Sequence, residues 1–379
     1  MPDRLYLDHN ATSPLRPECR DAMLGVMGTP ANPSSVHAEG RAAKAVVEGA
    51  RRALSDMVGA PPESVVFTGG GTEADATAIL GLARGGPQVR RLFIAATEHA
   101  AVPAAAEQSG LPTETVPVLT DGTLDLAWLD ERLSGYDADA DGPFLLCVML
   151  ANNETGVIHP VREAAAMARR AGGYTLVDAV QALGKTPIDF ATLGADLLAL
   201  SAHKAGGPVG VGALVVTPGL AFAPLLRGGG QEQMRRAGTH DVAGIAGFGA
   251  LAGTATPDAY APLATMRDEI EAGLPDGVTV WGRSAPRLPN TLCFSAPGYA
   301  SDAQVMTMDL AGLAVSAGSA CSSGKVRRSG VLAAMGADDE QGASAIRVSL
   351  GWDTPEDAAA RFLAAWTREH ARVSGRRAA

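Results

Sequence analysis

The chain has 379 residues, of which 46% are hydrophobic and 19% charged, a composition typical of a soluble globular protein. Its length exceeds what a single hydrophobic core usually supports, so we expect two domains. The formal net charge of -10 and the lack of a basic stripe exclude nucleic acid as an expected partner.

The N-terminal stretch MPDRLYLDHNATSP contains no apolar signal segment, and no apolar run in the sequence is long enough to span a bilayer. The four cysteines are scattered and form no C-x-x-C pair, so neither a disulfide framework nor a zinc site is predicted. We therefore expect a protein of the reducing cytoplasm that has no membrane partner and no bound metal.

Short apolar runs rich in β-branched residues alternate with alanine-rich stretches of helical character. The expected strands are SVVFTGG (64–70), RLFIAA (91–96), FLLCVML (144–150), YTLVDAV (174–180), DLLALSAH (196–203) and GALVV (212–216). Helical stretches lie between several of them, over 72–84, from Glu98 onward and over 161–172. This order predicts an α/β fold in which helices cover both faces of a mainly parallel sheet. Ligands bind such sheets beyond the carboxyl ends of the strands.

The pattern changes near GTATPDAYAPL (253–263), after which the connecting loops are longer. Strand-like segments then follow at WGRSAPRLPNTLCFSAPG (281–298), GLAVSAGSA (312–320) and AIRVSLG (345–351). We predict a large domain over residues 14–255 and a smaller α+β domain over residues 256–379. Residues 1–13 are expected to pack with the smaller domain.

The first candidate site is FTGGGTEAD (67–75), where a strand leads through three glycines into a helix. Backbone N–H groups at a helix start attract anions, and glycines let a phosphate approach closely. Gly71 and Thr72 are therefore candidates for phosphate binding. The segment lacks the lysine of a Walker P-loop. The alternative is a plain glycine turn with Thr72 as the helix N-cap.

The second candidate is Asp178, which lies within the apolar strand YTLVDAV. A buried carboxylate needs a cationic partner, because leaving it unpaired costs several kcal/mol. A pyridinium nitrogen of pyridoxal 5'-phosphate (PLP) would serve, and an arginine of the protein is the alternative. Gln181 is either a second contact or an ordinary helix residue.

The third candidate is SAHK, in which Ser201, His203 and Lys204 follow a buried strand. A lysine at the mouth of such a strand tends to lose its proton, and a neutral amine attacks carbonyl groups. The alternative is a lysine whose ammonium reaches solvent. A carbonyl-binding lysine, a carboxylate for a ring nitrogen and a phosphate cradle all lie at strand ends. PLP needs all three.

The fourth candidate is Cys321 in SAGSACSSGKVRR (316–328). Small residues surround it, whereas structural cysteines usually lie among Val, Leu and Ile. The cations Lys325, Arg327 and Arg328 favour the thiolate, which is the reactive form. A free surface thiol without function is the alternative.

Nine motifs follow one another along almost the whole chain: LYLDHNATSPL, NPSSVH, TEHAAV, ANNETGV, VDAVQALGK, SAHKAGGPVGVGAL, RAGTHDV, GSACSS and IRVSLG. In these motifs the chain resembles the cysteine desulfurases of the class V aminotransferase family, on the branch that supplies iron–sulfur cluster assembly. The resemblance implies the fold type I of PLP-dependent transferases. It also implies an obligate homodimer.

The resemblance further implies a role for each matching residue. Lys204 would carry the cofactor in a Schiff base, Asp178 would face its pyridine nitrogen, and His99 would stack on the ring and assist proton transfer. The other residues would bind as follows: Gln181 and Asn153 the ring's hydroxyl side; Thr72, Ser201, His203 and, from the neighbouring subunit, Thr239 the phosphate; Asn32 and Arg347 the substrate carboxylate. Taken alone, His99 fits a helix start, Asn32 a turn and Arg347 an ordinary surface position.

Cys321 would be the nucleophile that receives sulfur as L-cysteine is converted to L-alanine, and would pass it to an acceptor or iron–sulfur scaffold protein. Cys19, Cys147 and Cys293 match no motif and are interpreted as structural. GKVRRSG departs from the family's usual acidic, proline-containing sequence after the cysteine, which leaves the acceptor open. The alternatives are a selenocysteine lyase or aminotransferase of the same fold, or a non-catalytic sulfur-carrier scaffold.

Overall fold

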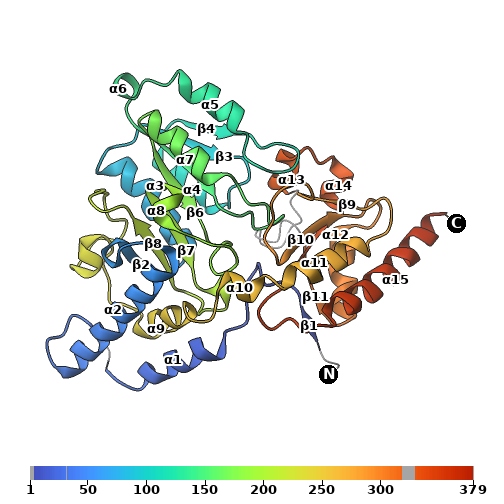
Figure 1. The fold of residues 1–379 in the computed structure, drawn as a ribbon, viewed down its shortest axis with the longest axis horizontal. Helices are drawn as coiled ribbons and strands as arrows, with labels where there is room; N and C mark the ends of the chain where they lie inside the picture. The colour runs from blue at the N-terminus through green and yellow to red at the C-terminus, as the bar shows by residue number, and fades with distance from the viewer. Residues whose placement is uncertain (1–3, 31, 318–328, 379) are drawn as a thin grey trace.

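The computed structural model describes residues 4–30, 32–317 and 329–378. Its larger sheet has seven strands, and helices cover both faces of it (Figure 1). In order across the sheet the strands are β2 (Val65–Thr68), β8 (Gly212–Val216), β7 (Leu197–Ser201), β6 (Tyr174–Asp178), β5 (Phe144–Met149), β3 (Arg91–Ala95) and β4 (Thr113–Val116). The six strands expected from the sequence are confirmed.

The larger sheet is mixed. Strands β4, β3, β5, β6 and β7 run parallel, whereas β8 runs antiparallel to both of its neighbours, β7 and β2. Only residues 202–211 connect β7 to β8, and a parallel crossover needs a dozen or more residues. The prediction of a mainly parallel α/β sheet is therefore confirmed, with an antiparallel pair at one edge.

Helices and turns connect these strands. The helices are α1 (Pro17–Met27), α2 (Ala38–Val58), α3 (Gly71–Arg84), α4 (Ala101–Ser109), α5 (Leu126–Ser134), α6 (Ala138–Asp141), α7 (Val161–Arg170), α8 (Phe190–Leu193) and α9 (Val242–Leu251). Short 3-10 turns lie at η1 (Pro62–Ser64), η2 (His203–Ala205) and η3 (Gln231–Met234).

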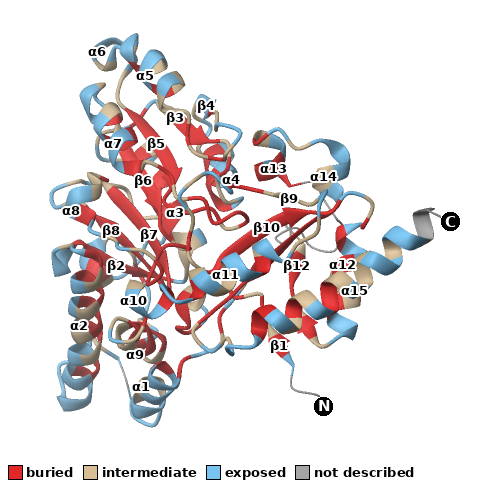
Figure 2. Cartoon of the chain, turned by 45° about the vertical axis from the view of Figure 1, so that its right-hand side comes forward, coloured by how far each residue is buried: buried red, intermediate tan, exposed pale blue. Residues whose placement is uncertain are grey.

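Strand β5 shows why the central strands are almost continuously apolar. Phe144, Leu146 and Val148 belong to the cluster that α2, α7 and α9 cover. Leu145 and Cys147 point to the other face, against α3 and α4. Successive strand residues alternate between faces, so a sheet covered on both sides needs apolar residues at every position. Figure 2 shows these strands buried along their length.

A second sheet has four strands in the order β12 (Ser316–Ala317), β13 (Ala345–Ser349), β10 (Thr291–Ser295) and β9 (Thr279–Val280), all paired antiparallel. Beside it, β1 (Leu5–Tyr6) pairs in parallel with β11 (Leu313–Ala314). The accompanying helices are α10 (Pro257–Tyr260), α11 (Leu263–Ala272), α12 (Ser301–Leu310), α13 (Gly330–Ala334), α14 (Asp339–Ala343) and α15 (Ala358–Ala378).

The second sheet has a hydrophobic cluster of its own. Phe294 of β10 packs edge-on against Trp366 of α15, with 5.2 Å between the ring centroids. Leu5 and Leu7, from the start of the chain, are buried in the same cluster. The chain thus has a hydrophobic core beside each of its two larger sheets. The domain limits at residues 14 and 256 stay predictions.

The three described cysteines are buried and free: Cys19, Cys147 and Cys293. Burial raises the pKa of Cys19 to about 11 and raises the pKa values of the other two thiols. None is therefore poised as a thiolate near neutral pH. In the described part of the chain, no helix has the length and apolar character needed to cross a membrane.

Candidate active site

A cavity of about 360 Å³ lies at the carboxyl ends of β5, β6 and β7, beside the glycine turn that follows β2. This is the sheet edge at which ligand binding is expected. Most of the predicted site residues line it: Gly71, Thr72, His99, Asn153, Asp178, Gln181, Ser201, His203, Lys204 and Arg347. The fold therefore brings together residues that span most of the chain.

The glycine turn forms one wall of the cavity. Gly70 is the N-cap of α3, with φ 150°, and no side chain caps this helix end. The alternative interpretation of Thr72 as the N-cap is therefore wrong. A Cβ atom at Gly71 would lie 2.6 Å from Cγ2 of Val180, so only glycine fits there. Because α3 starts without a side-chain cap, its first N–H groups are suited to bind an anion.

Ser201 and His203 extend this anion-binding wall. Both line an adjoining hollow together with Gly71 and Thr72. The Nδ1 atom of His203 lies 3.1 Å from Oγ1 of Thr12. Burial, followed by the charges of Lys204 and Lys185, lowers the pKa of His203 to about 4, so its imidazole is neutral near pH 7.

Asp178 is the last residue of β6 and is 7% exposed. Its Oδ1 atom accepts a hydrogen bond from the backbone N–H of Val180 at 2.8 Å. Burial raises the pKa of Asp178, while that hydrogen bond and the charges of His99 and Lys204 oppose the rise. No arginine of the described chain contributes to this balance. The carboxylate therefore suits a cationic ligand atom in the cavity.

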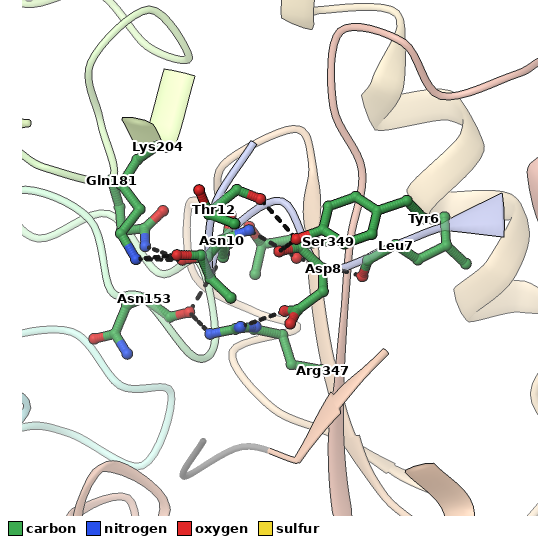
Figure 3. Close-up of polar contacts among 12 residues, drawn as sticks. Tyr6, Leu7, Asp8, Asn10, Thr12, Asn153, Gln181, Lys204, Arg347 and Ser349 are labelled. Carbon is green, nitrogen blue, oxygen red and sulfur yellow. Dashed lines mark hydrogen bonds and ion pairs between the residues drawn. The ribbon is translucent and has the colours of Figure 1, made fainter. Parts of the chain in front are cut away.

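Lys204 lies in η2, directly after β7, and is half-buried. Its Nζ atom donates to the backbone carbonyl oxygens of Asn10 and Ala11, at 2.8 Å each (Figure 3). The segment that follows β1 thus supplies the oxygens that hold the amine beside the cavity. These contacts favour the cavity interpretation of Lys204 over an ammonium that extends into bulk solvent.

Arg347 reaches the cavity from β13 and is only 3% exposed, so the interpretation as a surface arginine is wrong. Its Nη2 atom donates to Oδ1 of Asp8 at 2.7 Å, and its Nη1 atom donates to the backbone oxygen of Asn153 at 2.8 Å (Figure 3). Its Nε atom has no hydrogen-bond partner among the described residues. A ligand carboxylate at Arg347 would therefore compete with Asp8 for the guanidinium.

His99 has two roles in the structure. It lines the cavity, and its Nδ1 atom accepts a hydrogen bond from the backbone N–H of Ala101 at 3.2 Å, at the start of α4. The helix-start interpretation and the cavity interpretation of His99 are thus compatible. Because Nδ1 accepts, the proton of the neutral ring lies on Nε2.

Two further acids lie close to Asp178. Asp75, from α3, lines the cavity at 1% exposure, and its Oδ1 atom has no hydrogen-bond partner among the described residues. Glu98 accepts from the backbone N–H of Met149 at 2.5 Å. Burial, and then the charge of Asp178, raises the pKa of both acids well above its usual range. Asp178 differs from these two acids because the charges of His99 and Lys204 oppose the rise of its pKa.

Sequence reasoning missed several of these residues: Asp8, Asn10, Asp75 and Lys185. Asp8 and Asn10 follow the apolar run LYL within the motif LYLDHNATSPL. Lys185 stands in the quoted motif VDAVQALGK. Their contacts join segments far apart in the chain, so no local pattern indicated them.

Two predicted residues lie elsewhere in the structure, and the structure does not describe a third. Thr239 lines a separate small hollow together with Gly69 and Arg236. Asn32 is exposed, and its side-chain oxygen accepts from the backbone N–H of Ser34 at 3.0 Å, which is the turn geometry of the alternative interpretation. Cys321 lies outside the described residues.

The residues of the cavity fit PLP, the cofactor implied by the resemblance. The volume of the cavity lies in the range of small-molecule sites. The wall at Gly71 leaves no room for a side chain, as close approach of a phosphate requires. An amine, a buried carboxylate and an uncapped helix start are the groups that the cofactor's aldehyde, ring nitrogen and phosphate need.

Comparisons with known proteins show which family the chain resembles. The model of the aminotransferase class-V family matches residues 5–362. A cysteine desulfurase of Cereibacter sphaeroides is 42% identical over 362 residues, which cover 93% of this chain and 92% of that protein. An IscS-like cysteine desulfurase of Mycobacterium tuberculosis is 38% identical and covers 94% of this chain and 95% of its own. The X-ray structure of a NifS-like protein from Rickettsia africae superposes with a TM-score of 0.88 at 30% identity, covering 98% of this chain and 100% of that one.

Proposed function

The chain belongs to the aminotransferase class-V family, and on that premise we propose that it is a PLP-dependent cysteine desulfurase serving iron–sulfur cluster assembly. It converts L-cysteine to L-alanine and retains the sulfur as a persulfide on Cys321. The observation that carries this proposal is the meeting of Lys204, Asp178 and the start of α3 in one cavity. The names of the relatives at 42% and 38% identity support the substrate.

We assign the cofactor contacts to residues that line the cavity. Gly71, Thr72, Ser201 and His203 hold the phosphate, with neutral His203 acting as a hydrogen-bond partner. Asp178 would hold the ring nitrogen of the cofactor, and Gln181 and Asn153 would hold its hydroxyl side. When bound, PLP supplies an electron sink for charge that develops at the substrate α-carbon.

The protein's own residues then orient the substrate and move protons. Arg347 binds the substrate carboxylate, for which its planar fork of N–H donors is suited. The Nζ amine of Lys204 takes and returns the proton at the substrate α-carbon. The imidazole of His99, which lines the cavity and would face the cofactor ring, is a second proton carrier.

Cys321 performs the sulfur transfer. Its thiolate attacks the sulfur of L-cysteine, so that a sulfur–sulfur bond forms while the bond between sulfur and the substrate β-carbon breaks. The carbon skeleton leaves as L-alanine after gaining a proton, and Cys321 keeps the sulfur. A sulfur-acceptor or iron–sulfur scaffold protein of the cytoplasm then receives it.

The active form in this proposal is a homodimer in which Thr239 reaches the phosphate of the neighbouring subunit. Large apolar side chains that are exposed in the single chain support such an interface. Leu24 and Met27 of α1 are 61% and 64% exposed, and Val209 and Met234 are 71% and 75% exposed. Both Val209 and Met234 precede Thr239 in the sequence, and Met234 is close to it. Leaving these side chains in water forfeits hydrophobic free energy.

The decisive test supplies the purified protein with PLP and L-cysteine. We expect equal amounts of alanine and transferable sulfur, with the persulfide mapped to Cys321 by mass spectrometry. Cys321→Ser should keep the visible spectrum of the bound cofactor and its shift on adding cysteine, but lose sulfur transfer, because a hydroxyl is a far poorer nucleophile than a thiolate.

Cys293→Ser is the matched control, since this thiol is buried and its pKa is raised by burial. It should retain sulfur transfer in the molecules that fold. Persulfide on one of the buried cysteines, or alanine formed by Cys321→Ser at the wild-type rate, would overturn the assignment of the nucleophile. Alanine formation that requires an added keto acid would indicate an aminotransferase instead.

A further inference from the structure

Asn10 is a hydrogen-bonding hub between the two sheets, and it is 1% exposed. Its backbone N–H donates to Oγ of Ser349 at 3.0 Å. Its amide nitrogen donates to Oγ1 of Thr291 at 2.9 Å and to the backbone oxygen of Asn153 at 3.3 Å. Its backbone oxygen accepts from Lys204 at 2.8 Å and from Gln181 at 2.9 Å (Figure 3). Asn10 therefore contacts both the amine of Lys204 and the side-chain amide of Gln181.

Lys185 stands behind this hub, and it is 2% exposed. Its Nζ atom donates to Oε1 of Gln181 at 2.9 Å and to Oδ1 of Asn10 at 3.3 Å. The ion pairs found among the described residues do not include Lys185. Burial, and then the charges of Lys204 and Arg347, lowers its pKa well below the usual range. A neutral amine keeps two N–H groups, one for each of the two amide oxygens.

These contacts determine which way the amide of Gln181 faces. Its oxygen points to Lys185, and its nitrogen points to the backbone oxygen of Asn10. The reversed amide would bring two oxygens together at the Asn10 contact, 2.9 Å apart, and two hydrogen-bearing nitrogens together at the Lys185 contact. The Asn10 contact would be repulsive, and the amide oxygen would lose the hydrogen bond that Lys185 donates, so the observed orientation is preferred.

We propose that Lys185 is a positioning residue for the cofactor: by holding the amide oxygen of Gln181, it makes that wall of the cavity a hydrogen-bond donor. The second hydrogen on the Gln181 amide nitrogen is then available to an oxygen of a bound ligand. Asn10 shares the task, because it receives both Lys185 and Gln181. The inference rests on the proposed function, in which Gln181 contacts the hydroxyl side of PLP.

The test titrates cofactor-free protein with PLP and follows the visible spectrum, without turnover. Lys185→Met removes both donors while keeping an unbranched apolar stem. We expect the PLP dissociation constant to rise about tenfold, as for the loss of one hydrogen bond, together with a changed ratio of the long- to short-wavelength bands. Lys44→Met, on the exposed side of α2, is the matched control and should change neither quantity.

A double-mutant cycle separates positioning from a general structural effect. In protein that carries Gln181→Met, adding Lys185→Met should change neither the spectrum nor the dissociation constant further, because the amide that Lys185 orients is gone. Additive effects, or a Lys185→Met spectrum and affinity equal to those of wild type, would overturn the inference. Lys185→Gln, which retains an N–H donor one atom nearer the backbone, should restore part of the affinity if Lys185→Met folds poorly.

These outcomes differ from a failure of the proposed function. A wild-type protein that binds PLP but forms no alanine from cysteine would overturn the desulfurase assignment and leave the Lys185 comparison intact. A wild-type protein that does not bind PLP would overturn both.

Discussion

Single buried polar groups give the cavity its chemical character. Burial raises the pKa values of three neighbouring acids, Asp75, Glu98 and Asp178, but only for Asp178 do the charges of His99 and Lys204 oppose the rise. In the same cavity the Nζ atom of Lys204 donates to two backbone oxygens. The cavity thus offers the carboxylate of Asp178 to a cationic ligand atom.

The first prediction concerns the amine. The sequence contains only four lysines, so reduction with borohydride followed by peptide mapping distinguishes them clearly. In wild type the cofactor should be found on Lys204. Lys204→Ala should form alanine at least about a hundredfold more slowly, because the attachment point and the proton carrier are lost together. PLP attached to Lys185 or Lys44 of wild type would contradict this assignment.

The second prediction concerns acid stability and His159, a buried residue outside the cavity. Its Nδ1 atom accepts from the backbone N–H of Leu124 at 3.2 Å, and its Nε2 atom lies 3.3 Å from Oγ1 of Thr97. Burial lowers the pKa of His159 to about 4, against the opposing charge of Asp121. Between that value and the ordinary pKa near 6.5, the unfolded chain binds more protons than the folded one.

The free energy of unfolding should therefore fall as the pH drops from about 6.5 to 4, by up to about 1.4 kcal/mol per pH unit from this group. His159→Gln keeps an acceptor and a donor but cannot be protonated, so denaturant melts over this pH range should show a smaller slope. The buried His9, whose pKa burial lowers to about 3, contributes a slope of the same sign that remains in the variant. Equal slopes for variant and wild type would exclude the role of His159.

At the scale of helices and loops, the start of α13 is tied to the loop that follows β5. Ser329 is the N-cap of α13, and its Oγ atom accepts from the backbone N–H of Leu332 at 3.0 Å. The same hydroxyl donates to Oε2 of the buried Glu154 at 2.5 Å. Ser329 is the first described residue after 318–328, the segment that contains Cys321, and Glu154 is the neighbour of Asn153 at the cavity.

A third prediction follows for Ser329→Ala, which loses both hydrogen bonds of the hydroxyl. The variant should lose about 1–2 kcal/mol of stability, as is typical for removal of an N-cap. Persulfide formation on Cys321 should slow several-fold. The cysteine concentration that gives half of the spectral shift should stay equal to that of wild type. Cysteine binding should be unchanged although persulfide formation slows, because Arg347 keeps its contact with Asn153.

Ser329→Thr is the control for this prediction, since it retains the hydroxyl that caps the helix and contacts Glu154. It should form persulfide at nearly the wild-type rate. If Ser329→Ala also transfers sulfur at that rate, the tie between α13 and the loop after β5 has no part in catalysis.

For the molecule as a whole, the segment of residues 5–12 joins the two sheets. Leu5 and Leu7 are buried in the hydrophobic cluster of the smaller sheet, whereas Asn10 lies at the cavity of the larger one. Asp8 pairs with Arg347 of the smaller sheet and thereby brings this side chain beside the cavity. The site is thus assembled by the way the two sheets pack, and in our proposal a second subunit completes it.

The fourth prediction tests that completion with mixed dimers of a weakly PLP-binding variant and an inactive variant, assayed at a limiting concentration of PLP. Thr239→Ala should weaken PLP binding several-fold, and Lys204→Ala should be inactive. If Thr239 serves the neighbouring subunit, a heterodimer of the two variants has one intact site, with Lys204 from one chain and Thr239 from the other. Tagged heterodimers should then form alanine at about half the wild-type rate per dimer. Activity no higher than that of the two parent homodimers would show that Thr239 does not act across the interface.

The character of the strands and the chemistry of the site are readable from local patterns. The apolar runs predicted six strands of the larger sheet, and Gly71, Asp178 and Lys204 stood out because each is unusual beside a buried strand. The antiparallel direction of β8, the pairing of Asp8 with Arg347, and the roles of Asn10 and Lys185 emerged only from packing. Direction depends on where a connection can fit, and a polar side chain finds its partner among groups brought from distant parts of the chain. Neither the direction of a strand nor the partner of a buried polar side chain is encoded in the residues that neighbour it in the sequence.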